Sequence, residues 1–294
     1  MRRTAAAAAL VVVLACAGCE GGAASPGESP PAMADTAASS SALRTGPPVP
    51  PVPGIAAEVV EYRSDRAVGG RVSVAVTDTG EEPFSVTAVA LDSPGFTPLP
   101  AVPATASFVP GRRFDLRTPY GAPVCDTAAE PAAARLTVER PGGVVAEVRV
   151  PLAAEVLRGI HARLCAAVAV ERVVDVAVVD LAADGDAVTG RLVLARSDDD
   201  AEAVTVTRVQ GNVLYDADAQ LPLDLAVGDP EASTGIVFTT ARCDPHALAE
   251  TQQPYLMLLG VRVADGAETV LDLPLDDAQR ELLHELTDRV CTPA

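Results

Sequence analysis

Residues 70–92, GRVSVAVTDTGEEPFSVTAVALD, decide the fold, because residues 190–212, GRLVLARSDDDAEAVTVTRVQGN, repeat them without a gap. The shift between the two stretches is 120 residues, which is too long a period for a solenoid repeat. The sequence therefore predicts two copies of one domain. The identical pairs are Gly70/Gly190, Arg71/Arg191, Ala75/Ala195, Asp78/Asp198, Glu82/Glu202, Val86/Val206, Thr87/Thr207 and Val89/Val209.

The repeat continues beyond this block with small changes of spacing. Cys125-Asp126 matches Cys243-Asp244 at a shift of 118, and Cys165 matches Cys291 at a shift of 126. Such drift indicates short insertions in loops between shared elements. We expect a first copy over residues 55–168 and a second over 169–294, each long enough for an independent core.

Each copy alternates apolar and polar residues over short runs, as strands do. Val72, Val74 and Val76 share one parity, and turn signals such as Asp184-Gly185-Asp186 separate the runs. Short strands with frequent turns are typical of β-sandwiches. We therefore expect a mainly β protein of tandem, duplicated immunoglobulin-like β-sandwich domains. The strands expected later in each copy are 113–118, 135–140 and 144–150, then 236–240, 256–263 and 268–273.

One helix is expected at the end of each copy, because apolar residues there recur at helical spacing. Asp276 or Asp277 is suited to cap the second helix. The expected buried stripes are Val156, Leu157, Ile160 and Leu164 in the first copy, and Ala278, Leu282, Leu286 and Val290 in the second.

Four cysteines follow the N-terminal segment, and four cysteines allow three pairings. The duplication favours Cys125–Cys165 and Cys243–Cys291, one bond per copy, with sequence separations of 40 and 48. A zinc site built from these thiolates is disfavoured, because they form no CxxC pair and no cluster with ligand spacing.

The N-terminus reads as a lipoprotein signal peptide over residues 1–19. Arg2 and Arg3 precede an apolar run from Ala5 to Ala15, which is too short to span a bilayer. Val13-Leu14-Ala15-Cys16 resembles the bacterial lipobox, which implies lipidation of Cys16, with Cys19 as the alternative. Residues 20–54 are rich in Pro, Ser and Ala and are expected to form a disordered tether.

Composition argues against some classes of partner. The formal net charge of -18 argues against nucleic acid and anionic membrane surfaces, and the favoured interpretation of the acidity is that it only keeps the protein soluble. Five Phe, four Tyr and no Trp leave few flat aromatic faces for sugars or single-stranded nucleic acid.

The best candidate for chemistry is Asp244 with His246 and Glu250, near His284 if the second disulfide forms. These residue types could bind a metal ion or transfer protons. Three observations oppose a site: Cys243 is used in a bond, the first copy has Ala128 where the second has His246, and His284 faces away from the helix stripe. A turn or helix cap is the favoured role for Asp244.

Two further features are better explained by structural roles than by a functional site. His161 lies on the apolar edge of its helix and is expected to be a partly buried packing residue. The acidic runs 197–200 and 216–218 lack the ligand spacing of a calcium loop and are expected to be solvated hairpin loops.

The stretch Arg242-Cys243-Asp244-Pro245-His246-Ala247, followed by strands, a helix and a final Cys, resembles an uncharacterised family of secreted actinobacterial lipoproteins. That resemblance implies no known activity. The sequence thus favours a non-enzymatic lipoprotein on the outer face of the cytoplasmic membrane. Such a protein would need no cofactor and would bind an unknown envelope or extracellular protein. The alternatives are an enzyme using Asp244, His246 and Glu250, and a solute-binding component of a transporter.

Overall fold

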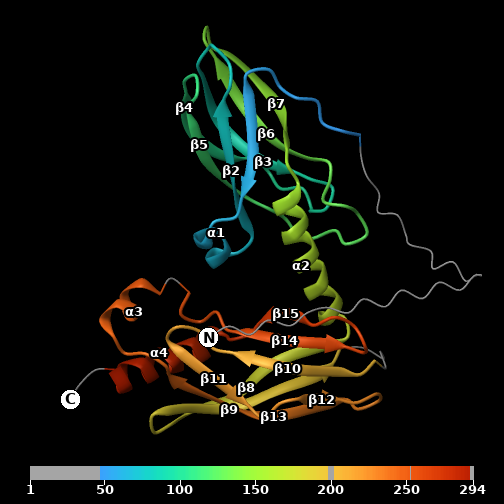
Figure 1. Ribbon diagram of the computed structural model, residues 1–294, viewed down its shortest axis with the longest axis vertical. Coiled ribbons are helices and arrows are strands. Elements are labelled where there is room, and N and C mark those ends of the chain that lie inside the picture. The colour runs from blue at the N-terminus through green and yellow to red at the C-terminus, as the bar shows by residue number, and fades with distance from the viewer. Residues whose placement is uncertain (1–46, 198–201, 252, 292–294) are drawn as a thin grey trace, which may run out of the picture. The chain divides into compact units, whose positions relative to one another are not determined.

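The computed structural model describes residues 47–197, 202–251 and 253–291. Cys16, Cys19, the expected signal peptide and most of the expected tether lie outside the described residues. The described chain is mainly β-structure with all strand pairing antiparallel, as the sequence predicts (Figure 1).

The first sandwich is built from two sheets, in the strand orders β1-β2-β5 and β4-β3-β6-β7. A short helix α1 (Arg63–Val68) lies between β1 and β2, and α2 (Glu155–Glu171) follows β7. The strands are β1 (Ile55–Val60), β2 (Arg71–Asp78), β3 (Phe84–Asp92), β4 (Val102–Phe108), β5 (Arg113–Pro119), β6 (Ala132–Arg140) and β7 (Val144–Leu152).

The second sandwich has the strand orders β8-β9-β13-β11 and β12-β10-β14-β15. Helix α3 (Pro245–Glu250) follows β13, and α4 (Asp277–Cys291) follows the last strand. The strands are β8 (Val174–Asp184), β9 (Ala187–Arg196), β10 (Val204–Gln210), β11 (Tyr215–Ala219), β12 (Leu223–Leu225), β13 (Glu231–Thr240), β14 (Leu258–Val263) and β15 (Thr269–Asp272).

The two sandwiches share one topology, which bears out the duplication read from residues 70–92 and 190–212. In the first sheet of each copy, β2 or β9 is central, between β1 and β5 or between β8 and β13. In the second sheet, β3 corresponds to β10, with β4, β6 and β7 matched by β12, β14 and β15. All six strands expected late in the copies are present, although β13 begins five residues earlier than expected, at Glu231, and β6 begins three residues earlier, at Ala132.

Strand β11 has only a trace of a counterpart in the first copy. It pairs with β13 from Tyr215↔Thr240 to Ala219↔Ile236. At the matching place in the first copy, Phe96 and Pro123 form a single bridge. The acidic residues Asp216 and Asp218 therefore lie in a strand, and the expectation of a hairpin loop there is wrong. A strand forms because their alternation with buried or half-buried neighbours fits an edge position.

Each sandwich encloses its own cluster of buried apolar side chains. Val72, Val74 and Val76 are fully buried in the first cluster, as their shared parity predicts. The second cluster begins at Val170, near the end of α2. Burying one such Val or Leu side chain contributes about 1.5–3 kcal/mol. Separate cores are compatible with the expected boundary at residues 168/169, which stays a prediction.

The helix of each copy packs its apolar stripe on the core, but the stripe of α4 differs from the prediction. Helix α2 buries Leu157 and Ile160 as expected. Helix α4 buries Leu283, Leu286 and Thr287, whereas Ala278 and Val290 are exposed. An i, i+4 row drifts by 40° per step around a helix of 3.6 residues per turn, so its ends leave the core face.

The Pro-rich end of the expected tether belongs to the first sandwich. The amide of Ile55 donates to the carbonyl of Val52, and Val52 packs against the first core. The amide of Thr79 donates to the carbonyl of Gly54 at 3.0 Å. Gly54 has a φ of 79° and lies close to Gly80, a conformation that favours glycine.

Candidate functional site

Asp244 acts as a helix cap, as the sequence favours. It precedes α3 with extended backbone angles, and its Oδ1 accepts a hydrogen bond from the amide of Ala247 at 3.0 Å. Its other oxygen pairs with Arg242 at 2.8 Å. The amide of Ala247, followed by the Arg242 guanidinium, lowers the pKa of this carboxyl. Both oxygens of Asp244 are therefore engaged in local structure.

Of the other residues of the expected site, His246 and Glu250 lie in α3 with Asp244 at its start, and His284 lies in α4. His246 lies in the first turn of α3 and is exposed, while Glu250 ends that helix. His284 lies on the exposed side of α4, where its Nε2 is 3.8 Å from a carboxylate oxygen of Asp288. Among the described residues, no group of three or more His, Cys, Asp or Glu side chains could hold a metal ion.

Both predicted disulfides are confirmed. Cys125 and Cys165 join with their Cα atoms 5.5 Å apart, and Cys243 and Cys291 with theirs 5.1 Å apart. Each bond ties the terminal helix to the loop that follows β5 or β13. Closing loops of this length stabilises a domain by about 4 kcal/mol in the chain-entropy view.

A buried polar residue lies four positions before the helix cysteine in both copies. In the first copy this is His161, whose Nε2 lies 3.1 Å from the carbonyl of Val124. Its ring packs edge-on against Phe96, so the expectation of a packing histidine is confirmed. In the second copy it is Thr287, whose hydroxyl is 2.7 Å from the hydroxyl of Tyr215.

A small cleft of about 410 Å³ opens beside the second disulfide. Tyr215 and Tyr255 stack in its wall with ring centroids 6.2 Å apart, and His284 and Asp288 lie at its rim. The Tyr215 hydroxyl donates to the carbonyl of Leu283 at 2.8 Å. Burial raises the pKa of both tyrosines. These phenols are neutral packing groups, because their protons are held in the folded state at ordinary pH.

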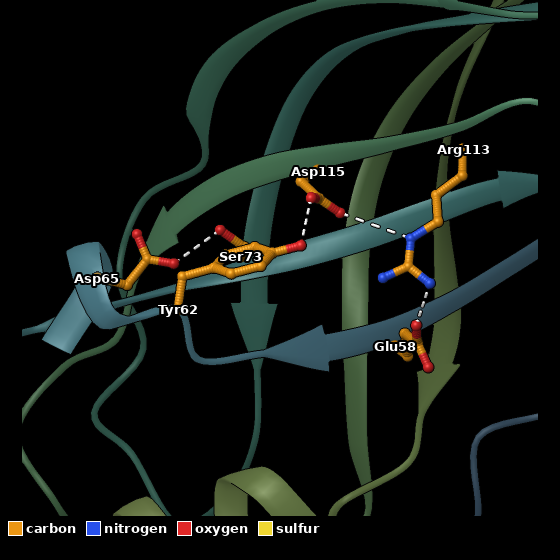
Figure 2. Close-up of polar contacts among 6 residues, drawn as sticks. All are labelled: Glu58, Tyr62, Asp65, Ser73, Arg113 and Asp115. Carbon is orange, nitrogen blue, oxygen red and sulfur yellow. Dashed lines mark hydrogen bonds and ion pairs between the residues drawn. The ribbon is translucent and has the colours of Figure 1, made fainter.

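A charged network covers the outer face of sheet β1-β2-β5, and the sequence did not reveal it (Figure 2). Its centre is Asp65 of α1, whose carboxylate is fully buried. Ser73 of β2 donates to it at 2.8 Å, and Arg71 and Arg117 pair with it at 3.2 and 3.6 Å. The buried charge is therefore paired, which burial requires, and it fixes α1 to the sheet.

The network continues along the same face toward the start of β5. Tyr62 donates to Asp115 at 2.5 Å, and this hydrogen bond is the main reason that the pKa of Tyr62 is raised. Arg113 pairs with Asp115 at 3.7 Å and with Glu58 of β1. Each acidic side chain on this face thus has a partner, so the face is charged but locally neutralised.

Part of this network has a structural role, because the repeated Gly-Arg pair, Gly70-Arg71 and Gly190-Arg191, forms a similar ion pair in both copies. Arg71 pairs with Asp65, which lies in the element before β2. Its equivalent Arg191 pairs at 2.8 Å with Asp180, which lies in β8, the element before β9. Asp180 has a φ of 56° and lies at a bulge of β8. An arginine bound to a preceding aspartate is therefore common to both copies.

Comparisons with known proteins add no family. No protein-family profile and no curated protein matches the chain. One solved structure that it resembles is a protein of unknown function from Porphyromonas gingivalis W83, at 12% identity and a TM-score of 0.20. That similarity covers 75% of this chain and 98% of the other. Within the described residues, no helix is long and apolar enough to cross a membrane.

Proposed function

We propose that this protein is a non-enzymatic lipoprotein on the outer face of the cytoplasmic membrane. Its lipid anchor would be attached to Cys16, or alternatively to Cys19, and residues 20–51 would serve as the tether. The two sandwiches would bind a protein of the envelope or the extracellular space. This role needs no cofactor and no nucleic acid.

The observation that carries the proposal is the pair of matched disulfides, Cys125–Cys165 and Cys243–Cys291. Structural disulfides persist in oxidising compartments and are rare in the cytosol. A chain with two disulfides in equivalent positions of its two domains is therefore expected outside the cytoplasm. The apolar run that ends at Val13-Leu14-Ala15-Cys16 supplies the matching export and lipidation signal.

A binding role is supported by where the polar residues are used. Asp244, the strongest candidate for acid–base chemistry, has one oxygen in a helix cap and the other in an ion pair with Arg242. The charged network around Asp65 also serves to hold α1 in place. The outer face of sheet β8-β9-β13-β11, where Val237 is 39% exposed, is left open for a contact with another protein.

The test is to follow the full chain by membrane fractionation and by metabolic labelling with a radioactive fatty acid. Replacing Cys16 and Cys19 together by Ala is expected to abolish labelling and release the protein from the membrane. The Gly18→Ala variant serves as the matched control and should remain labelled. A double cysteine variant that stays bound to the membrane would contradict the anchor.

The non-enzymatic part of the proposal has its own test. The purified protein and its Asp244→Asn variant are both analysed for bound metal by mass spectrometry. We expect no stoichiometric metal in either sample. One metal ion per chain, lost in the Asp244→Asn variant, would instead favour the alternative site with His246 and Glu250.

A further inference from the structure

The two copies share a topology but differ greatly in charge. Residues 55–168 contain 11 Arg against 13 acidic residues, a formal net charge of -2. Residues 169–294 contain 8 Arg against 24 acidic residues, a formal net charge of -16. Solubility would not require the acidity to be confined to one copy. The difference therefore points to a role that only the second copy has.

The outer face of sheet β8-β9-β13-β11 shows how part of this charge is arranged. Opposed residues of an antiparallel sheet share a face, and the pairing places Asp216, Thr239, Ala187 and Asp184 in one row across all four strands. The two carboxylates stand at opposite ends of that row, about 14 Å apart from the usual strand spacing.

The neighbouring row has a carboxylate at one end only. It runs from Asp218 of β11 through Val237 and Thr189 to Ala182 of β8. Val237 is 39% exposed although it lies in the middle of the sheet. Ser233, Gly235 and Thr239, which share its parity on β13, are exposed as well. The strip from Ser233 to Thr239 along β13 is therefore uncharged and open, with Asp216 and Asp218 beside it on β11. On β9, Arg191 lies opposite Gly235 on the same face and pairs with Asp180 of β8.

The carboxylates on the borders lack partners of opposite charge. Within the described part of the chain, Asp184, Asp216 and Asp218 form no ion pair and no side-chain hydrogen bond. On the equivalent face of the first copy, Arg113 neutralises Glu58 and Asp115, and α1 is held against β2 by the hydrogen bond from Ser73 to Asp65. The acidic side chains on this sheet are thus neutralised in the first copy, whereas the second copy keeps three unpaired carboxylates beside the Arg191–Asp180 pair.

We propose that the outer face of sheet β8-β9-β13-β11 docks a basic segment of a partner protein. Lys or Arg side chains on both flanks of that segment would reach Asp216 and Asp218 on one border and Asp184 on the other. Its backbone and small apolar side chains would lie over Val237 and Thr239. The spacing of about 14 Å between the borders is wide enough for an α-helix or an extended strand.

This inference rests on the proposed binding function and adds the chemistry of the partner. Charge complementarity favours a cationic protein, because unpaired carboxylates attract and steer basic partners. The same charges would repel an anionic lipid surface. Binding to an anionic membrane is therefore not proposed, and the experiment includes anionic vesicles to test against it.

The experiment uses the full chain purified in a non-ionic detergent and a fluorescent 12-residue peptide of alternating Lys and Thr. Fluorescence anisotropy at low salt measures the dissociation constant, and a Glu-Thr peptide checks the sign of the charge. The Asp216→Asn/Asp218→Asn variant is expected to weaken binding about 5- to 10-fold. The matched control, Glu281→Gln/Glu285→Gln on the exposed side of α4, should change it less than about 2-fold.

A second variant tests whether the peptide binds at this face of the sheet. Val237→Arg puts a cation at the exposed centre of the face and is expected to weaken binding at least 10-fold. An equal loss of affinity in the Asp216/Asp218 variant and the Glu281/Glu285 variant would overturn the proposal, because it would mean that the peptide is attracted by the overall negative charge and not by this face. Unchanged binding in Val237→Arg, binding of the Glu-Thr peptide, or stronger binding to anionic vesicles than to the Lys-Thr peptide would overturn it as well.

The outcome is separable from that of the anchor experiment. The double Ala variant of Cys16 and Cys19 is expected to bind the Lys-Thr peptide with unchanged affinity. The Asp216→Asn/Asp218→Asn variant is expected to fractionate with the membrane like the natural protein. Failure of the docking face therefore leaves the lipoprotein assignment standing, and failure of the anchor leaves the docking face standing.

Discussion

The first sheet of each sandwich gives the sharpest comparison in the molecule. On sheet β1-β2-β5 the outward charges are paired, and α1 is bound to the surface through Asp65. On sheet β8-β9-β13-β11 a two-residue turn, Gly185-Asp186, takes the place of α1 and the surface stays open. A single ancestral face has thus acquired two surfaces of different chemistry.

What the two faces retain is structural. Arg71 and Arg191 each bind an aspartate of the preceding element, and each copy closes a disulfide onto its helix. These features recur because the fold needs them in both copies. Features that differ between the copies are free of that requirement. The insertion of α1 and the unpaired carboxylates of β11 are therefore where specialised binding should be sought.

The largest effect expected is from removal of one disulfide, and it tests whether the copies are separate folding units. Cys125→Ser/Cys165→Ser should lower the stability of the first copy by about 4 kcal/mol. Hydrogen exchange followed by mass spectrometry should show the loss of protection between residues 55 and 168 only. Cys243→Ser/Cys291→Ser is the matched counterpart, with its loss confined to the second copy. Loss of protection across both copies in either variant would mean that they share one cooperative core.

The next effect compares the two arginine–aspartate pairs. Asp65 is fully buried between Ser73 and two arginines, so Asp65→Ala should lower the free energy of unfolding by about 3 kcal/mol. The side chain of Asp180 is 69% exposed, so Asp180→Ala should cost no more than about 1 kcal/mol. Urea unfolding of both variants measures the difference. Equal losses would show that burial is not what distinguishes the two pairs.

Much of the fold can be read from the sequence because the duplication doubles every signal. Alternation on Val72, Val74 and Val76 identifies one strand, and its repeat at residues 190–196 confirms the pattern. The matching cysteines select one of three pairings. The same reasoning applied at a shift of 126 would also have placed the stripe of α4, since Leu157, Ile160 and His161 correspond to Leu283, Leu286 and Thr287.

The remaining features depend on contacts between distant residues. Helix α1 has only six residues and is held by Asp65, whose partners Arg71 and Arg117 lie on two different strands. No local pattern in residues 63–68 indicates that such partners exist. The row that joins Asp216 to Asp184 likewise depends on the register of three strand pairs. Composition shows the acidity of the second copy but not which carboxylates share a face.

The smallest effect expected concerns Asp244, for which the first copy provides a comparison in Asp126. Asp126 follows Cys125 in a turn and is exposed, whereas Asp244 accepts from the amide of Ala247 and pairs with Arg242. Because these contacts lower the pKa of Asp244 in the folded state, its contribution to stability is present above its unfolded pKa and is lost as pH falls below about 4.

Asp244→Asn removes the charge but keeps a side chain that can cap a helix. Its melting temperature should fall slightly below that of the natural protein at pH 7, and the difference should shrink as the pH falls through the lowered pKa of Asp244. Asp126→Asn should show no such convergence, because Asp126 has neither contact. A gap between Asp244→Asn and the natural protein that widened toward low pH would mean that the carboxylate destabilises the cap.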